Sequence, residues 1–178
     1  MDRKIALFAL FALALFAAAT LPAWAAPPEI ADVIKSEKPY GEGHMNFLFI
    51  KAYNARLWTD APVWSMDAPF AMEITYGMGF DTDDLVERTI KEMKIVDPAI
   101  SDAEIARLTP ELNKVYPPVK SGDRLVALYV PGKPVMFSHN GEPTGSIGGE
   151  SFIKDFFGIW LSPNTSAPSL RKNLLKLK

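Results

Sequence analysis

The sequence predicts a single α+β domain with a curved, mainly antiparallel sheet and helices packed on one face. Three observations predict it. Strand-like segments come first, helices follow, and strands and then helices return, so the order does not alternate as parallel βαβ units would. No linker composition divides the chain after its N-terminal segment. The length of 178 residues suits one domain with a sizeable core.

The N-terminal segment has the pattern of a signal peptide. Arg3 and Lys4 precede a run of fifteen apolar residues, 5–19, and Ala23-Trp24-Ala25 offers a small-x-small cleavage site. A membrane-spanning helix needs about 20 apolar residues. We therefore expect residues 1–25 to be a signal peptide and the mature protein to be periplasmic or secreted. Residues 26–38 are expected to be an extended tether, and residues 39–178 the single domain.

Composition excludes several classes of function. The chain has no cysteine, so neither a thiol nor a lipid-attachment cysteine is present. Its net charge of −2 and the lack of a basic block indicate no nucleic-acid partner. The C-terminal end carries three lysines, Lys172, Lys176 and Lys178. One interpretation is weak contact with an anionic membrane surface. The preferred interpretation is a solvated helix end, where cations suit the helix dipole.

Two strands are predicted in the first half of the domain. Residues 47–58 form the longest strand candidate, with Phe49, Lys51 and Tyr53 on one face and Arg56 on the other. Residues 70–76 alternate clearly between apolar and polar positions and predict the second strand.

Two helices follow these strands. Residues 81–84 are acidic or hydroxylic and cap a helix that ends near Lys94. Ser101 and Glu104 form a capping box at the start of another helix, which ends before the proline pair at 117–118. Pro110 lies inside it and predicts a kink, or a restart with Thr109 as the new cap.

The C-terminal third predicts strands at residues 123–130 and 135–138, a turn at 140–141, a short strand near 145–148, and helices at 151–161 and near 169–175. In the first of these helices, Lys154, Asp155 and Gly158 are the only positions from 152 to 161 that are not apolar. Most of its surface must therefore be covered. The bland interpretation is a core helix. The functional one is that Phe156 and Trp160 line an apolar cleft, and both can hold together.

Three local patterns of the C-terminal third carry a family resemblance. Gly145-Ser146-Ile147 precedes the apolar helix, Ile159-Trp160-Leu161 ends it, and a Ser-Pro-rich link leads into Leu-Arg-x-x-Leu-Leu at 170–175. This order resembles the bacterial chalcone-isomerase-like family, including its exported members, and the resemblance extends from about Tyr40 to the C-terminus. It implies the family's fold, with a ligand cleft between sheet and helices.

The resemblance also implies where chemistry would lie. Chalcone isomerases close a ring of a planar polyphenol with an arginine, strand and helix hydroxyl groups and ordered water. The segment from Gly41 to His44 resembles the family's Gly-x-Gly-Val-Arg pattern, with His44 taken to replace the arginine. The segment 50–53 resembles the strand that carries the family's lysine and catalytic threonine, and Tyr53 stands at the threonine. Thr89 is the best match for the helix tyrosine. A histidine is mostly neutral near pH 7, so the permanent charge of the arginine is missing.

Three hypotheses for the function remain. The first is a non-catalytic binder of an apolar or amphipathic small molecule such as a fatty acid, which some family members bind. The second is an isomerase or intramolecular lyase with His44 as acid or base and Tyr53 as hydroxyl donor. The third is an envelope partner protein without a small ligand. No cofactor and no metal site are predicted, because the two histidines, His44 and His139, have no metal-ligand spacing.

The predicted ligand-binding residues combine polar groups of the first strand with apolar side chains. Lys51 and Arg56 lie on opposite faces of a regular strand, so they cannot both face one pocket. Lys51 is preferred for a carboxylate, because its face includes Phe49 and Tyr53 and the family resemblance falls there. The full set is Lys51, Tyr53, His44, Phe49, Phe156 and Trp160.

Processing can be tested directly. We expect the mature protein to begin at Ala26 and to be recovered from the periplasm or the medium, because the apolar run is short for a stable anchor. N-terminal sequencing and intact mass measure this. A membrane-bound protein that retains Met1 would contradict the prediction.

Overall fold

A six-stranded antiparallel sheet in chain order forms the framework of the protein. The structure is a computed structural model and describes residues 25–178 except residue 48. The strands are β1 (Gly41–Phe47), β2 (Ile50–Trp58), β3 (Phe70–Tyr76), β4 (Arg124–Tyr129), β5 (Val135–His139) and β6 (Glu142–Ile147). The helices are the short 3-10 helix η1 (Pro28–Ile30), α1 (Thr82–Val96), α2 (Asp102–Val115), α3 (Glu150–Leu161) and α4 (Pro168–Leu175).

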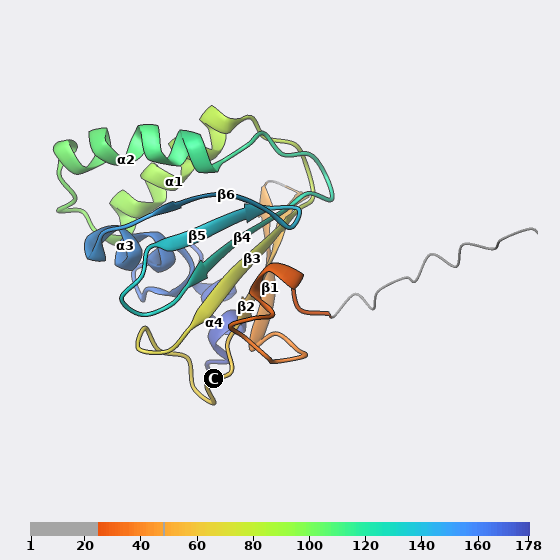
Figure 1. Cartoon of the computed structure of the whole chain (residues 1–178). Coiled ribbons are helices and arrows are strands. Elements are labelled where there is room, and N and C mark those ends of the chain that lie inside the picture. Colours follow the sequence, from red (N-terminus) through yellow and green to blue (C-terminus); the bar gives the residue numbers. More distant parts are fainter. Residues whose placement is uncertain (1–24, 48) are drawn as a thin grey trace, which may run out of the picture.

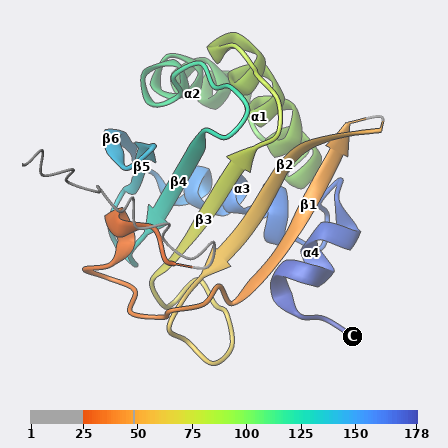
Figure 2. The same cartoon turned by 90° about the vertical axis from the view of Figure 1, so that its right-hand side faces the viewer.

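The layers match the predicted architecture. Figures 1 and 2 show a curved sheet with α1, α2, α3 and α4 on one side of it and the segment around η1 on the other. The helices enter as two pairs, the first between β3 and β4 and the second after β6. The α+β fold class and the mainly antiparallel sheet predicted from the sequence are confirmed.

The predicted strand over residues 47–58 is wrong in its first part. The chain forms a hairpin there, with β1 from Gly41 to Phe47 paired to β2 and a turn before Ile50. The glycines at 41 and 43 do not favour a strand, so composition gives no signal for β1. Residues 41–47 become a strand through their pairing with β2, and α4 packs on this strand.

Gly41 shows how close that approach is. A Cβ atom added at Gly41 would lie 2.0 Å from the main-chain oxygen of Leu174 in α4. Real atoms do not approach so closely, so any side chain at 41 would push α4 away from the sheet. The residues that resemble the family's Gly-x-Gly pattern therefore serve helix packing on the first strand.

The aromatic residues of α3 occupy the centre of the core. Phe152, Phe156 and Phe157 are almost completely buried. The ring centroids of Phe157 and of Phe70 on β3 are 4.6 Å apart. Those of Phe156 and of Phe137 on β5 are 5.4 Å apart. Both pairs meet edge to face. The core-helix interpretation of this segment is confirmed.

The polar stripe predicted on α3 is not a solvent-facing one. Only Lys154 is exposed, whereas Asp155 and Gly158 are buried. A Cβ atom at Gly158 would lie 2.6 Å from Cγ1 of Val96, so this glycine lets α1 pack closely against α3. Burial raises the pKa of Asp155 above its ordinary value, although Ser151 Oγ donates a hydrogen bond of 3.3 Å to it.

The segment predicted as an extended tether is packed on the sheet instead. Ile30 and Ile34 are buried against Trp58, Ala71, Val126 and Leu128, on the face that the helices leave open. Glu29 pairs with Arg124 at 2.9 Å and accepts a hydrogen bond from Ser138. Ile30 and Ile34 thus cover the apolar side chains on the face of the sheet that carries no α-helix.

The local signals of the helices are met in part. The capping box at Asp81 and Asp84 opens α1, and the Ser101 Oγ atom accepts a hydrogen bond from the Glu104 N–H group at the start of α2. The predicted restart at Thr109 is wrong. Helix α2 continues through Pro110, and the Thr109 hydroxyl donates to the carbonyl of Ile105 rather than capping a new helix. Within residues 25–178 apart from 48, no helix is long and apolar enough to cross a membrane.

Phe157→Ala should lower the free energy of unfolding by about 3–5 kcal/mol, because it leaves a cavity at the contact between α3 and the sheet. Phe49→Ala is the matched control. Its ring is fully exposed, so its substitution should cost less than about 0.5 kcal/mol. Urea denaturation of both variants measures the difference, and similar losses would contradict this packing.

Candidate functional site

A cavity of about 510 Å³ lies between the helix-covered face of the sheet and the helices α1 and α3. Its walls are mainly apolar and its volume is typical of small-molecule sites. The side chains or main-chain atoms that line it belong to Met45, Asn46, Ala52, Tyr53, Met72, Ile74, Tyr76, Met78, Gly79, Phe80, Asp84, Leu85, Arg88, Thr89, Glu92, Tyr116, Leu125, Val126, Ala127, Phe137, Phe156, Ile159, Trp160, Ser166 and Ala167.

The exposed lining residues show where the cavity opens to solvent. Asn46 at the end of β1, Gly79 after β3, Asp84 and Arg88 on α1, and Ser166 between α3 and α4 are exposed, whereas most other lining residues are buried or half-buried. We call these five exposed residues the mouth of the cavity.

A bulge in β2 decides which side chains of that strand reach the cavity. Met45 pairs with Tyr53, but the next residue, Asn46, pairs with Lys51, so Ala52 is an extra residue in β2. The bulge reverses the alternation of side chains between Lys51 and Tyr53. Both Ala52 and Tyr53 line the cavity, and Lys51 is exposed and does not.

Tyr53 supplies a polar group to the otherwise apolar interior of the cavity. Trp160 Nε1 donates a hydrogen bond of 3.1 Å to the Tyr53 hydroxyl oxygen, which ties β2 to the end of α3. Burial raises the pKa of this phenol, and the bond from Trp160 and the nearby Arg88 charge oppose that rise. At neutral pH the Tyr53 hydroxyl is therefore protonated and can donate a hydrogen bond of its own.

Arg88 brings a positive charge to the mouth. Its guanidinium group pairs with the buried carboxylate of Glu92 at 2.7 Å, and its own side chain is 57% exposed. Glu92 also accepts a hydrogen bond from the Ser166 hydroxyl at 2.5 Å. Among the described residues that line the cavity, Arg88 is the only lysine or arginine.

A second group of hydroxyls lies beside Thr89. The Thr89 hydroxyl donates a hydrogen bond of 3.3 Å to the Tyr116 oxygen, and burial raises the pKa of Tyr116 to about 12. Burial also raises the pKa of Tyr76 strongly, and the Tyr76 ring meets the Tyr53 ring edge to face. These phenols stay neutral at any ordinary pH, so they offer the cavity hydrogen-bonding groups and no negative charge.

The structure brings together half of the predicted ligand-binding residues. Tyr53, Phe156 and Trp160 line the cavity. Lys51, His44 and Phe49 do not: Phe49 is at the tip of the β1–β2 turn, and the bulge turns Lys51 away. Our preference for Lys51 assumed a regular strand, and the bulge removes the basis for it.

His44 points away from the cavity for a reason visible in the register. Gly41, Gly43 and Met45 alternate onto the helix-covered face, so His44 lies on the opposite face, paired with Asn54. Counted from Gly41, the fifth position of the Gly-x-Gly-Val-Arg pattern is Met45, which lines the cavity. The arginine position of the family pattern is therefore apolar here, and the assignment of His44 to it is corrected.

Sequence reasoning missed Arg88 and Glu92. A signal was present, because Leu85, Arg88, Thr89 and Glu92 recur at three- and four-residue spacing on one face of the predicted helix.

Within the described part of the chain, no group of three or more metal-ligating side chains could hold a metal ion. Lys176 at the C-terminal end lies over the Tyr40 ring, 5.0 Å from its centre. Membrane contact by the C-terminal lysines stays a prediction.

The comparison with known families agrees with this architecture. The sequence profile of the chalcone isomerase-like family matches residues 40–176, which is most of the chain. The chain belongs to the chalcone isomerase-like family. The match begins at the residue before β1 and ends after α4, so it spans the whole sheet and the helices α1 to α4, of which α1 and α3 line the cavity.

A solved structure shares the fold. The crystal structure of a fatty-acid binding protein from Arabidopsis thaliana superimposes with a TM-score of 0.58 at 11% sequence identity, and the alignment covers 78% of this chain and 86% of that chain. At such low identity the likeness shows the fold alone. A search of curated proteins found no significant match.

The hydrogen bond between Tyr53 and Trp160 can be measured by a double-mutant cycle. We expect Tyr53→Phe and Trp160→Phe to show a coupling free energy of about 0.5–1.5 kcal/mol in unfolding experiments, because each change removes the same bond. Strictly additive losses would mean that the bond does not hold β2 to α3.

Proposed function

We propose that this chalcone isomerase-like protein is an exported, non-catalytic binder of an amphipathic small molecule, with a fatty acid as the ligand class. The observation that carries the proposal is the combination of a mainly apolar cavity with one cation, Arg88, at its mouth. An acyl chain suits the walls, and a carboxylate suits the guanidinium group. The fatty-acid binding protein of the same fold supports the ligand class.

In this proposal two groups bind the carboxylate. Arg88 supplies charge-assisted donors, and its exposure lets it turn from Glu92 to an incoming anion. The Tyr53 hydroxyl is neutral because burial raises its pKa, so it can donate to the same group. In this proposal the acyl chain runs along Phe156, Ile159 and the strand residues of the cavity floor.

The expected affinity is moderate. Burial of a dozen methylene groups contributes roughly 10 kcal/mol before costs, at about 0.8 kcal/mol each. Association and ordering cost about 4–15 kcal/mol. Dissociation constants in the micromolar range are therefore a realistic expectation.

The isomerase hypothesis has less support from the geometry. Neither described histidine lines the cavity, so His44 is not positioned as an acid or base for a bound molecule. Met45 occupies the place where the family pattern has arginine, and an apolar side chain there cannot stabilise a developing oxyanion.

The test compares a fatty acid with the fatty alcohol of equal chain length. Arg88→Met should weaken the acid about ten- to a hundredfold, the range for loss of a charge-assisted hydrogen bond, and leave the alcohol nearly unchanged. Lys51→Met is the matched control, because it removes an exposed cation outside the cavity, and it should change neither affinity. Isothermal titration calorimetry on delipidated protein measures all three proteins.

The other outcomes separate the hypotheses. Equal losses for acid and alcohol would show that Arg88 shapes the mouth without recognising charge. The double variant Arg88→Met/Glu92→Gln, which leaves no unpaired buried carboxylate, checks that a loss does not come from unfolding. Absence of binding for both ligands would overturn the proposal and favour an envelope partner protein without a small ligand.

A further inference from the structure

The turn between β1 and β2 presents apolar side chains to solvent. Phe49 is fully exposed and the neighbouring Ile50 is 58% exposed. Figure 2 shows that the ends of β1 and β2 next to this turn project beyond the other strands, on the side of α1. Single exposed apolar residues are ordinary on protein surfaces. Two consecutive large ones at the tip of a projecting turn are in a position to enter an apolar medium without any rearrangement.

The tip lies next to the mouth of the cavity. Asn46 belongs to the mouth and pairs with Lys51, the residue directly after Ile50. Ala52 and Tyr53 follow at once and line the cavity wall. A surface that receives the Phe49 side chain would therefore lie close to the opening through which a ligand enters.

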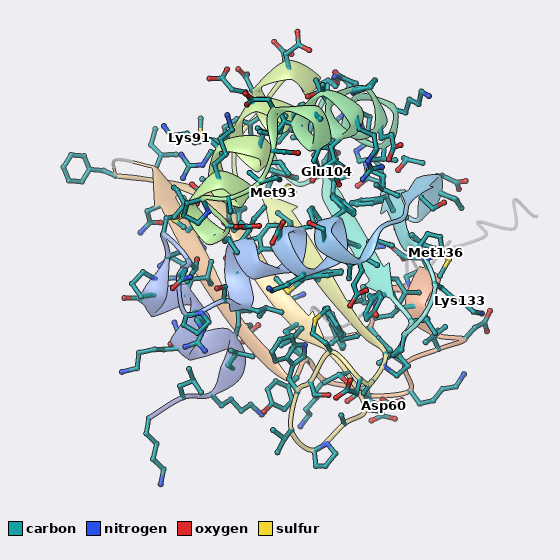
Figure 3. The ribbon with its side chains drawn as sticks, turned by 90° about the vertical axis from the view of Figure 1, so that its left-hand side faces the viewer. Asp60, Lys91, Met93, Glu104, Lys133 and Met136 are labelled. Atoms are coloured by element: carbon teal, nitrogen blue, oxygen red, sulfur yellow. The ribbon has the colours of Figure 1, made fainter. Side chains whose placement is uncertain are left out.

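The charges around this site are mixed, with cations nearest to the tip. Lys51 adjoins it, and Arg88 and Lys91 lie three residues apart on α1, so they share a face of that helix. Figure 3 shows Lys91 on the side of α1 from which the β1–β2 turn projects. Asp84 and Glu87 on the same helix are exposed as well. Apolar insertion, rather than charge, must therefore supply most of the attraction.

We propose that the β1–β2 turn inserts Phe49 and Ile50 into the surface of a lipid bilayer and thereby turns the mouth of the cavity towards the lipid headgroups. The insertion itself rests only on the exposed turn. The further step, passage of an amphiphile between bilayer and cavity, rests on the proposed function as a fatty-acid binder. The protein stays outside the bilayer core and contacts its interface with this turn alone.

The size of the tip favours lipid over a protein partner. A specific protein interface buries about 1,200–2,000 Å² in total, which two side chains on a narrow turn cannot supply. Interfacial insertion needs only a few apolar side chains, and its strength rises with the apolar area that is buried. Lysines and arginines beside the inserted residues then meet phosphate groups at headgroup level.

The experiment measures flotation of the delipidated mature protein with vesicles of phosphatidylcholine, alone or mixed with phosphatidylglycerol. We expect weak binding to the first and stronger binding to the second. The double variant Phe49→Ser/Ile50→Ser should lower the partition coefficient at least about tenfold on both, because it removes most of the apolar area that is inserted.

Val63→Ser is the matched control. Val63 is 73% exposed in the connection from β2 to β3, at the opposite end of β2 from the turn. The partition coefficient of the Val63→Ser variant should equal that of the unmodified protein. Added salt should reduce only the gain from phosphatidylglycerol, since screening acts on exposed charges and not on apolar insertion.

Several results would overturn the proposal. They are equal flotation of the unmodified protein and the double variant, no flotation with either vesicle, or loss through Val63→Ser as large as through the double variant. Phe49-dependent self-association in sedimentation experiments without vesicle binding would also overturn it, in favour of a second copy as the partner. Calorimetry of the fatty acid in vesicle-free solution is independent of these results. Failure of the insertion and failure of the proposed function therefore remain distinguishable.

Discussion

The burial of α3 is the constraint on which the rest of the structure depends. Between Phe152 and Leu161 only Lys154 is exposed, so the helix needs cover on nearly every side. The sheet supplies one side through edge-to-face contacts with Phe70 and Phe137, and α1 supplies another where Gly158 lets Val96 approach. The remaining surface, at Phe156, Ile159 and Trp160, becomes a wall of the cavity. Core and candidate site are thus made by the same helix.

The first hairpin sets the chemistry of that site. The register of β1 turns Met45 inward and His44 outward, and the one-residue bulge at Ala52 turns Tyr53 inward and Lys51 outward. The two basic candidates of the strands, His44 and Lys51, are thereby removed from the cavity. What remains is a set of neutral phenols and, from α1, Asp84 and the Arg88–Glu92 pair. This interior is the basis of the proposed binding of an amphiphile.

The two faces of the sheet are covered by different means. Four helices cover one face, and the segment around η1 covers the other with Ile30 and Ile34. Beneath this segment, Trp58 Nε1 donates a hydrogen bond of 2.8 Å to Glu73, whose carboxylate also lies 3.7 Å from Arg56. Burial raises the pKa of Glu73 in spite of these partners. This face buries a polar network, whereas the helix-covered face carries the cavity.

The sequence by itself determined the class of fold, most of the elements and the core character of α3. Strand Phe70–Tyr76, the start of α1 and the aromatic face of α3 are local patterns, in which side-chain period and capping residues act within a few positions of one another. The apolar helix was enough to predict that Phe156 and Trp160 would line a cleft.

Only the tertiary structure decided which polar residues reach that cleft. A bulge of one residue reverses side-chain direction, and no residue type between 50 and 53 announces it. Residues 41–47 form a strand by pairing with β2, and α4 packs directly against this strand at Gly41. Arg88 and Glu92 become site residues because α1 packs across the sheet, a long-range arrangement that their spacing only hints at. The predicted signal peptide lies outside the described residues except for Ala25, so compartment rests on sequence alone.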